Sequence, residues 1–192
     1  MRNEFLMADN KQVTRKGNWI ETYTGIHFYP LDPREEEISI IDIAHALSLI
    51  CRFNGHCKHF YSVAQHSVNV YKYLRERCPT DFNLQLAGLL HDASEAYISD
   101  VSRPVKSSLK GYLEIESNLM KVIFEAFDVP LGVHFEDADD LVLQAEAMRL
   151  MPGSWWTPNN LEIDVIDKPA IQVRHEFIKT YQSLVKARTG ST

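Results

Sequence analysis

The sequence predicts an all-α protein, a helical bundle preceded by an irregular flap over residues 1–37. Apolar residues recur at intervals of three and four between Tyr112 and Phe127, which is the spacing of one helix face. Further segments with this spacing follow polar residues that favour helix starts. The candidate strands lie in the flap, so we expect no large sheet.

The flap is rich in glycine and proline and shows no sustained hydrophobic period. Its segments 19–23 and 26–29 contain aromatic and β-branched residues, which favour extended backbone. We therefore expect these two segments to pair as a short hairpin.

Six helices are predicted after the flap. Asp42 and Ser62 are the expected N-caps of the first two, because their side chains can accept hydrogen bonds from the N–H groups of a first turn. Pro104 falls in a predicted loop over residues 99–108. The predicted helices run over residues 43–50, 62–76, 83–97, 112–127, 137–150 and 169–185.

The composition is that of a globular protein with one core. The chain has 192 residues, 45% of them hydrophobic and 24% charged, and we expect a single domain over residues 1–192. The formal net charge of −6 provides no general attraction to nucleic acid polymers or anionic membranes, so neither is an expected partner. The three cysteines, without a CxxC spacing, are expected to be reduced thiols in a cytoplasmic protein. We identify no pattern of a signal peptide or a membrane span.

The strongest chemical signal is the adjacent pair His91-Asp92 at the end of an apolar run, followed by Glu95 and Asp100. An imidazole next to a carboxylate can offer a nitrogen and an oxygen to one divalent metal ion. Glu95 lies four residues after His91, which on a continuous helix places both side chains on one face. This layout suits a metal-activated water with a carboxylate that takes its proton. The alternative is a helix C-terminus that is merely polar.

A hydrolytic metal site needs more ligands than this pair supplies, since such sites usually hold three or four protein side chains. His66 lies on the second predicted helix, and Asp137, Asp139 and Asp140 lie at the start of the fifth. A helix N-terminus favours carboxylates through its dipole, so at least one of the three aspartates is expected to have no ligand role.

The order His, His-Asp, Asp, with each ligand group on its own helix, resembles the HD superfamily of metal-dependent phosphohydrolases. The resemblance covers about residues 20–150 and points to the branch that includes 5′-deoxynucleotidase-like prophage proteins and phage-encoded dATP triphosphohydrolases. The motifs that carry it are Arg52-Phe53-Asn54-Gly55-His56, Tyr61-Ser62-Val63-Ala64-Gln65-His66-Ser67, His91-Asp92-Ala93-Ser94-Glu95-Ala96-Tyr97, and the separate residues Asp100, Pro104 and Lys106.

The resemblance implies the metal ligands His66, His91, Asp92 and Asp139. Asp139 is preferred because it precedes Glu146 by seven residues, as in the family's spacing, and its two neighbouring aspartates stay open as alternatives. Two imidazoles and two carboxylates suit one divalent transition metal, namely Mn, Co, Fe, Zn or Ni. A second metal that arrives with the substrate phosphates is a further implication.

The resemblance also assigns roles around the metal. Glu95 is expected to orient or deprotonate the attacking water, and Asp100 to help place that water or a leaving-group oxygen. Arg52 and Lys106 are expected to bind substrate phosphate, Arg52 because its planar fork can meet two phosphate oxygens at once.

Further residues are candidates for contacts to a nucleotide. Phe53 stands where deoxynucleotidase relatives carry tryptophan; it is kept as a substrate contact, although the packing of that tryptophan does not transfer directly. His56 is a candidate contact to phosphate or to the second metal. Trp155 and Trp156 can stack on a base or pack against the protein. After Glu146 the chain lacks the Arg-Asp pair that relatives often show, so no contact from that pair is expected.

These features predict an enzyme, most specifically a dNTP triphosphohydrolase with dATP as the leading substrate, which releases deoxynucleoside and triphosphate. A 5′-deoxynucleotidase acting on a deoxynucleoside monophosphate is the alternative, and a non-catalytic nucleotide-binding or regulatory protein is the second alternative. The first two reactions differ in the number of positively charged side chains needed to bind phosphates beyond the first. The candidates for these side chains are Arg52, Arg103, Lys106, Lys110 and Arg149. The resemblance also implies a homo-oligomer in the cytoplasm of a bacterial cell or a phage-infected host.

Overall fold

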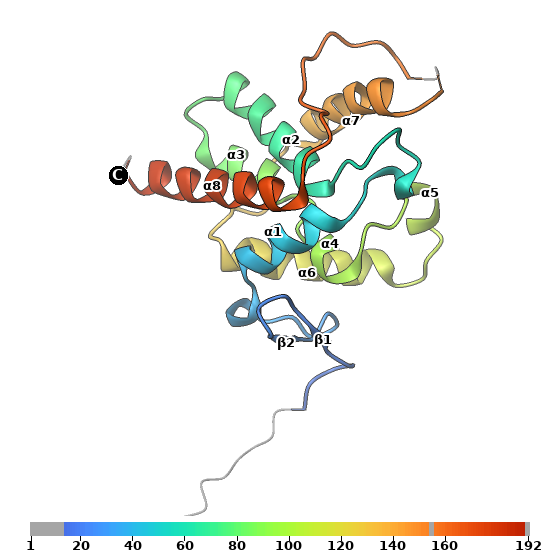
Figure 1. Cartoon of the computed structure of the whole chain (residues 1–192). Coiled ribbons are helices and arrows are strands. Elements are labelled where there is room, and N and C mark those ends of the chain that lie inside the picture. Colours follow the sequence, from blue (N-terminus) through green and yellow to red (C-terminus); the bar gives the residue numbers. More distant parts are fainter. Residues whose placement is uncertain (1–13, 154–155, 191–192) are drawn as a thin grey trace, which may run out of the picture.

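The computed structural model describes residues 14–153 and 156–190 and is mostly helical, which agrees with the predicted all-α class. Figure 1 shows a body of packed helices with a small hairpin attached at one end. The strands are β1 (Ile20–Glu21) and β2 (His27–Phe28), and the short 3-10 helices are η1 (Glu35–Glu37) and η2 (Phe53–Gly55). The α-helices are α1 (Ile40–Leu49), α2 (Val63–Arg77), α3 (Phe82–Leu90), α4 (Glu95–Ile98), α5 (Arg103–Lys106), α6 (Tyr112–Ala126), α7 (Glu136–Leu150) and α8 (Ala170–Thr189).

The central helix of the body is α2, which contacts α1, α3, α7 and α8. Its first turn is closed by a capping box, in which the Ser62 hydroxyl accepts from the Gln65 N–H and the Gln65 side chain accepts from the Ser62 N–H. This confirms Ser62 as the predicted N-cap. Fully buried side chains such as Ile43, Leu86 and Phe177 fill the space around α2, and each contributes roughly 1.5–3 kcal/mol by leaving water.

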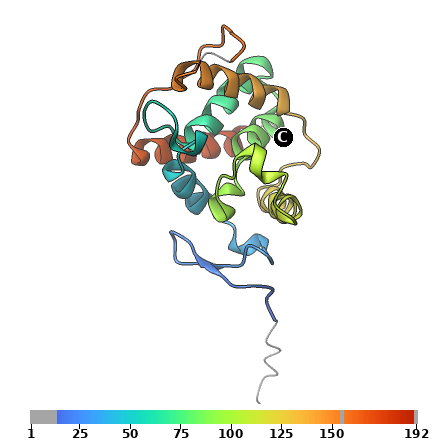
Figure 2. The same cartoon turned by 90° about the vertical axis from the view of Figure 1, so that its right-hand side faces the viewer.

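The predicted hairpin is confirmed. Strands β1 and β2 pair antiparallel, with Ile20 opposite Phe28. Figure 2 shows the hairpin lying beyond one end of the helical body. The Phe28 ring is fully buried and stacks on Tyr97 of α4, with the ring centroids 4.1 Å apart, so the flap is anchored by apolar contact.

The expected cap of the first helix was wrong. Helix α1 begins at Ile40, and the side chain of Ser39 accepts a hydrogen bond from the Ile41 N–H. Asp42 lies inside the first turn, where its buried carboxylate accepts from the N–H and the hydroxyl of Thr24, both at 2.7 Å. The carboxylate therefore joins the helix to the hairpin, a long-range contact that local capping patterns do not contain.

The single helix expected over residues 83–97 is two helices separated by a turn. The imidazole Nδ1 of His91 donates to the Gly88 carbonyl at 2.8 Å, which is the acceptor that the next helical N–H would use. The chain then tightens, with the Ala93 N–H bonded to Leu90 and the Glu95 N–H bonded to Asp92. His91 and Glu95 are consequently not on one continuous helix, contrary to expectation.

Two smaller expectations also changed. Residues 103–106 of the predicted loop form the short helix α5, with Pro104 in its first turn, where a missing N–H costs nothing. Helix α8 continues four residues beyond the expected end at position 185. Within the described ranges, no helix has both the length and the apolar character required to cross a bilayer.

Candidate metal centre

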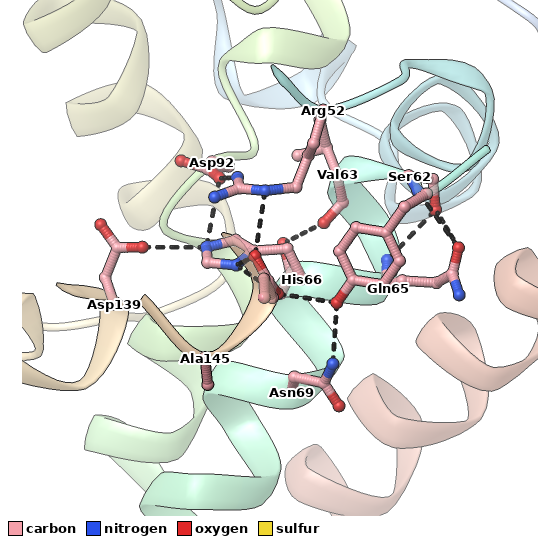
Figure 3. A network of polar contacts seen from close by, with 12 residues as sticks. Arg52, Ser62, Val63, Gln65, His66, Asn69, Asp92, Asp139 and Ala145 are labelled. Atoms are coloured by element: carbon pink, nitrogen blue, oxygen red, sulfur yellow. Dashed lines mark hydrogen bonds and ion pairs between the residues drawn. The ribbon is translucent and has the colours of Figure 1, made fainter. Parts of the chain in front are cut away.

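Three separate parts of the chain bring their predicted ligands to one point. His66 projects from α2, His91 and Asp92 occupy the turn after α3, and Asp139 projects from the first turn of α7. The Nε2 atoms of the two imidazoles are 3.2 Å apart. His66, His91 and Asp92 form a group whose donor atoms lie within 4.8 Å of one another and which can hold a metal ion. Figure 3 shows Asp92 and Asp139 on the same side of His66.

The two imidazoles are held in the orientation that metal binding requires. His66 is fully buried, and its Nδ1 faces the carboxylate of Glu146 at 2.9 and 3.1 Å. The Nδ1 of His91 faces the Gly88 carbonyl. Because each Nδ1 has an acceptor, the proton of each neutral ring belongs there and each Nε2 presents a lone pair. Burial lowers the pKa of His91, but the charge of Asp92 outweighs burial and raises this pKa to about 9. The metal-free site, with its Nε2 atoms 3.2 Å apart, therefore takes up a proton that a metal ion would displace.

The spacing of the donor atoms fits a small divalent ion. His91 Nε2 is 3.2 Å from Asp92 Oδ2, and His66 Nε2 is 2.9 Å from Asp139 Oδ1. The remaining nitrogen-to-oxygen distances are 3.8 Å from His66 to Asp92 and 3.7 Å from His91 to Asp139. An ion bound at about 2.1 Å places neighbouring ligand atoms about 3.0–3.4 Å apart. The four observed nitrogen-to-oxygen distances extend a little to both sides of this range. The mixture of nitrogen and oxygen donors suits a transition metal.

The structure separates the three aspartates of α7. Asp139 faces the imidazoles, and although burial opposes it, the contact with His66 Nε2 at 2.9 Å lowers the pKa of Asp139 to about 2. Asp140 is exposed and pairs with Arg103 at 3.4 Å. Asp137 is likewise exposed. A helix turns by about 100° per residue, so only one of three near-consecutive positions can face the pair His91-Asp92.

Glu146 is a site residue to which the sequence analysis assigned no role. It was used there only to select Asp139, which precedes it by seven residues. It is fully buried on α7, seven residues after Asp139 and therefore on the same helix face. Its carboxylate accepts from the Tyr61 hydroxyl at 2.7 Å and lies 3.3 Å from Arg52 Nε. Burial alone would raise the pKa of Glu146, but its contacts with His66 and Arg52 hold this pKa below its usual range. The sequence contained one sign of this role, because a glutamate seven residues after a candidate ligand aspartate lies on the same helix face.

Arg52 has a different position from the one expected of a free phosphate contact. Its guanidinium lies between Asp92 and Glu146, at 3.4 Å and 3.3 Å, and its side chain is 11% exposed. Figure 3 shows the guanidinium of Arg52 next to Asp92 and above His66. Arg52 therefore neutralises the acidic cluster and still lines the cavity described below.

We predict that Glu146→Leu destabilises the protein by about 3 kcal/mol, because it leaves buried Arg52 and His66 without their shared partner. Urea denaturation followed by circular dichroism measures the loss. Glu125→Gln removes only an exposed pair with Lys121, and we expect a change below about 0.5 kcal/mol. Equal stabilities of Glu146→Leu and the parent would contradict the role assigned to the buried carboxylate.

A cavity of about 430 Å³ opens over the metal group. Most predicted site residues line it: Arg52, Phe53, Asp92, Glu95, Asp100, Lys106 and Asp139. His56 does not, because it lies exposed on the turn after η2. Among the other candidates Arg103 and Trp156 line the cavity, Lys110 and Arg149 do not, and Trp155 lies outside the described residues.

Glu95 has the most perturbed environment on the cavity wall. It is 6% exposed, and its Oε2 has no hydrogen-bond partner among the described residues. Burial, followed by the negative charges of Asp92 and Asp100, raises the pKa of Glu95 to about 9. Burial and Asp92 also raise the pKa of Asp100. A carboxyl group with a displaced pKa in a cleft is the expected state of a proton-transfer residue.

The pKa of Glu95 predicts a pH-dependent stability of the metal-free protein. Between pH 4.5 and about 9 the folded state holds the Glu95 proton and the unfolded state has lost it, so this residue lowers stability as pH rises. We expect Glu95→Gln, in the presence of a chelator, to gain about 1–3 kcal/mol over the parent at pH 8 and little at pH 5. Thermal melts across this range test the difference, with Glu114→Gln as the exposed control. Parallel curves for parent and Glu95→Gln would refute the assignment.

Lys106 is the last residue of α5 and lines the cavity. Its ammonium group contacts Glu116 of α6 at 2.7 Å. Burial opposes it, but the hydrogen bond and charge of Glu116 raise the pKa of Lys106, which keeps the group charged near neutral pH. The side chain is 22% exposed and is thus held in place while it faces the cavity.

Comparison with known proteins identifies relatives of this chain. No family model matches it. It is 38% identical over 143 residues to the uncharacterized protein YfdR of Escherichia coli (strain K12), which covers 72% of this chain and 77% of YfdR. It is 36% identical over 119 residues to an uncharacterized protein of Rhodobacter capsulatus, which covers 60% of this chain and 61% of that protein. Identity at the first of these levels, over that share of both chains, places this chain and YfdR in one family.

Proposed function

We propose that this chain, which belongs to the family of the Escherichia coli protein YfdR, is a metal-dependent phosphohydrolase that acts on deoxynucleotides. One observation carries the proposal: two imidazoles, each with an acceptor at Nδ1, bring Nε2 atoms 3.2 Å apart next to the carboxylates of Asp92 and Asp139, which line a cavity. Two facing nitrogens and two carboxylates at one point attract a cation, and a bound metal ion displaces the proton that such a site otherwise holds.

The proposed cofactor is one divalent transition metal, Mn, Co, Fe, Zn or Ni, held by His66, His91 and Asp92 with Asp139 as the fourth ligand. Such an ion, when bound, acts as a Lewis acid toward water and a phosphate oxygen. Glu146 and the Gly88 carbonyl hold the two imidazoles in the ligating tautomer.

The other cavity residues take roles that follow from their charge. Glu95 accepts or returns a proton at Oε2, the atom that has no partner among the described residues. Asp100, half-buried beside it, orients the same water or the leaving oxygen. Lys106 and Arg103 attract the phosphate oxygens, and Phe53 packs against the nucleoside.

The leading substrate is a deoxynucleoside triphosphate, with dATP first, and the products are deoxynucleoside and triphosphate. This choice rests on the resemblance of the motifs to phage triphosphohydrolases. The cavity volume of about 430 Å³ lies in the range of small-ligand sites.

A specific observation supports the alternative, removal of phosphate from a deoxynucleoside monophosphate. Of the five candidate cations, three line the cavity, and all three, Arg52, Arg103 and Lys106, are already paired with carboxylates. A monophosphate brings less negative charge than a triphosphate and needs fewer free cations.

A substrate panel tests the proposal. The purified chain is incubated with dNTPs, dNMPs and rNTPs, with Mn²⁺ or Co²⁺, and the released anion is separated by ion chromatography. Triphosphate as the product supports the leading reaction, and orthophosphate from dNMPs supports the alternative. Metal-dependent nucleotide binding with no product from any substrate would overturn the enzymatic proposal in favour of a regulatory protein.

A further inference from the structure

Two thiols lie in contact at the base of a turn on the cavity wall. Cys51 Sγ and Cys57 Sγ are 3.6 Å apart, and both side chains are half-buried. Cys57 Sγ also lies 3.7 Å from the Arg52 carbonyl oxygen. A disulfide has a sulfur-to-sulfur distance of about 2.05 Å, so closure requires a movement of only about 1.5 Å.

The turn between the two cysteines is pinned at its start. An isolated bridge pairs Cys51 with Ser62, in which the Arg52 N–H donates to the Tyr61 carbonyl at 2.9 Å and the Val63 N–H donates to the Ile50 carbonyl at 3.0 Å. Cys51 is thereby attached to the start of α2, while Cys57 follows the exposed end of the turn. These backbone hydrogen bonds therefore fix the position of Cys51 relative to the helical body, and Cys57 Sγ lies against it.

The tip of this turn carries backbone strain. Phe53 has φ 55° and Asn54 has φ 51°, both in the left-handed region that side chains other than glycine rarely adopt. Such conformations cost of order 1–3 kcal/mol each and persist only when their surroundings impose them. A new covalent constraint across the turn will redistribute this strain.

We propose that Cys51 and Cys57 form a reversible disulfide under oxidation by hydrogen peroxide, which makes the turn a modification site on the cavity. The Cys51 thiolate attacks one peroxide oxygen; the O–O bond breaks, water leaves after protonation, and a sulfenic acid remains. The Cys57 sulfur then attacks the Cys51 sulfur, the S–O bond breaks, and a second water leaves. The two sulfurs supply the two electrons that reduce the peroxide, and a dithiol reductant reverses the bond.

The disulfide encloses three cavity-lining residues, Arg52, Phe53 and Asn54, in a closed ring. Arg52 spans Asp92 and Glu146, so a shift of the turn displaces the cation that balances these carboxylates. This regulatory consequence, unlike the disulfide itself, rests on the proposed function. We expect KM for the nucleotide to rise about tenfold, because carboxylates that Arg52 no longer balances repel the substrate phosphate.

Peptide mapping of the full chain tests the disulfide without any activity measurement. Trypsin cuts after Arg52, so the bond joins the fragments 35–52 and 53–58, which are otherwise separate. We expect this linked pair to accumulate with graded peroxide, to disappear with dithiothreitol and to be absent from Cys51→Ser and Cys57→Ser. Cys78→Ser is the control and should leave its yield unchanged. Peroxide treatment that yields only sulfinic acids or links through Cys78 would overturn the proposal.

Kinetics separate the modification from its consequence. The oxidised and reduced chains are compared with the nucleotide that the substrate panel identifies, and Cys57→Ser, treated with the same peroxide, controls for damage elsewhere. A KM increase that Cys57→Ser does not show supports regulation through the turn. If the linked peptides form but KM and kcat do not change, the disulfide stands and its regulatory effect is overturned. If the substrate panel identifies no substrate, the peptide map still decides whether the disulfide forms.

Discussion

We expect replacement of His91 or Asp92 by alanine to abolish metal binding and, with it, the proposed nucleotide turnover. Each side chain supplies one of the donor atoms that lie within 4.8 Å of one another. Loss of a residue that only supports a ligand commonly weakens metal affinity by about 10–100-fold, so loss of a ligand itself should exceed about 100-fold. Titration calorimetry with Mn²⁺ on the chelator-treated protein measures the effect directly.

Two matched variants control for this result. His56→Ala removes an exposed imidazole outside the cavity, and Asp140→Ala removes the exposed neighbour of Asp139. Both should bind Mn²⁺ as the parent does, whereas Asp139→Ala should weaken binding. Retained affinity in His91→Ala, or loss in Asp140→Ala equal to that in Asp139→Ala, would mean that the ligand set is incorrect.

Glu95→Ala will keep the metal and lose about two to four decades in kcat, the usual contribution of a positioned acid–base group. Glu95 lines the cavity beside Asp92, and its unpartnered Oε2 is the described carboxylate oxygen available to exchange a proton there. The measurement is single-turnover hydrolysis of the identified nucleotide at saturating Mn²⁺. The part of the pH dependence of kcat that arises from titration of Glu95 should be absent in the variant.

The control for Glu95→Ala is Glu114→Ala, which removes an exposed carboxylate from α6 and should leave the rate unchanged. Mn²⁺ titration of Glu95→Ala distinguishes a chemical role from a structural one. A variant with parental affinity and full rate would exclude Glu95 from the mechanism, and a variant that loses the metal would make it a ligand or a support of one.

Local sequence patterns predicted most elements of this fold. The amphipathic spacing of α6, the Ser62 N-cap of α2 and the hairpin of the flap depend on residues within a few positions of one another, and the structure confirms all three. Expectations failed where a side chain formed a distant or competing contact. Asp42 bonds to Thr24 instead of capping α1, and the His91 ring takes the Gly88 carbonyl and ends α3.

The candidate metal ligands were also visible in the sequence, because His91 and Asp92 are adjacent and His66 follows a recognisable helix start. Local patterns were therefore sufficient to predict the helical class and the residue types of the site. They could not show that Asp139 faces the imidazoles, that Glu146 orients His66 or that Arg52 bridges two carboxylates. Each of these contacts joins helices or turns far apart in the chain, so it depends on how α2, α3 and α7 pack.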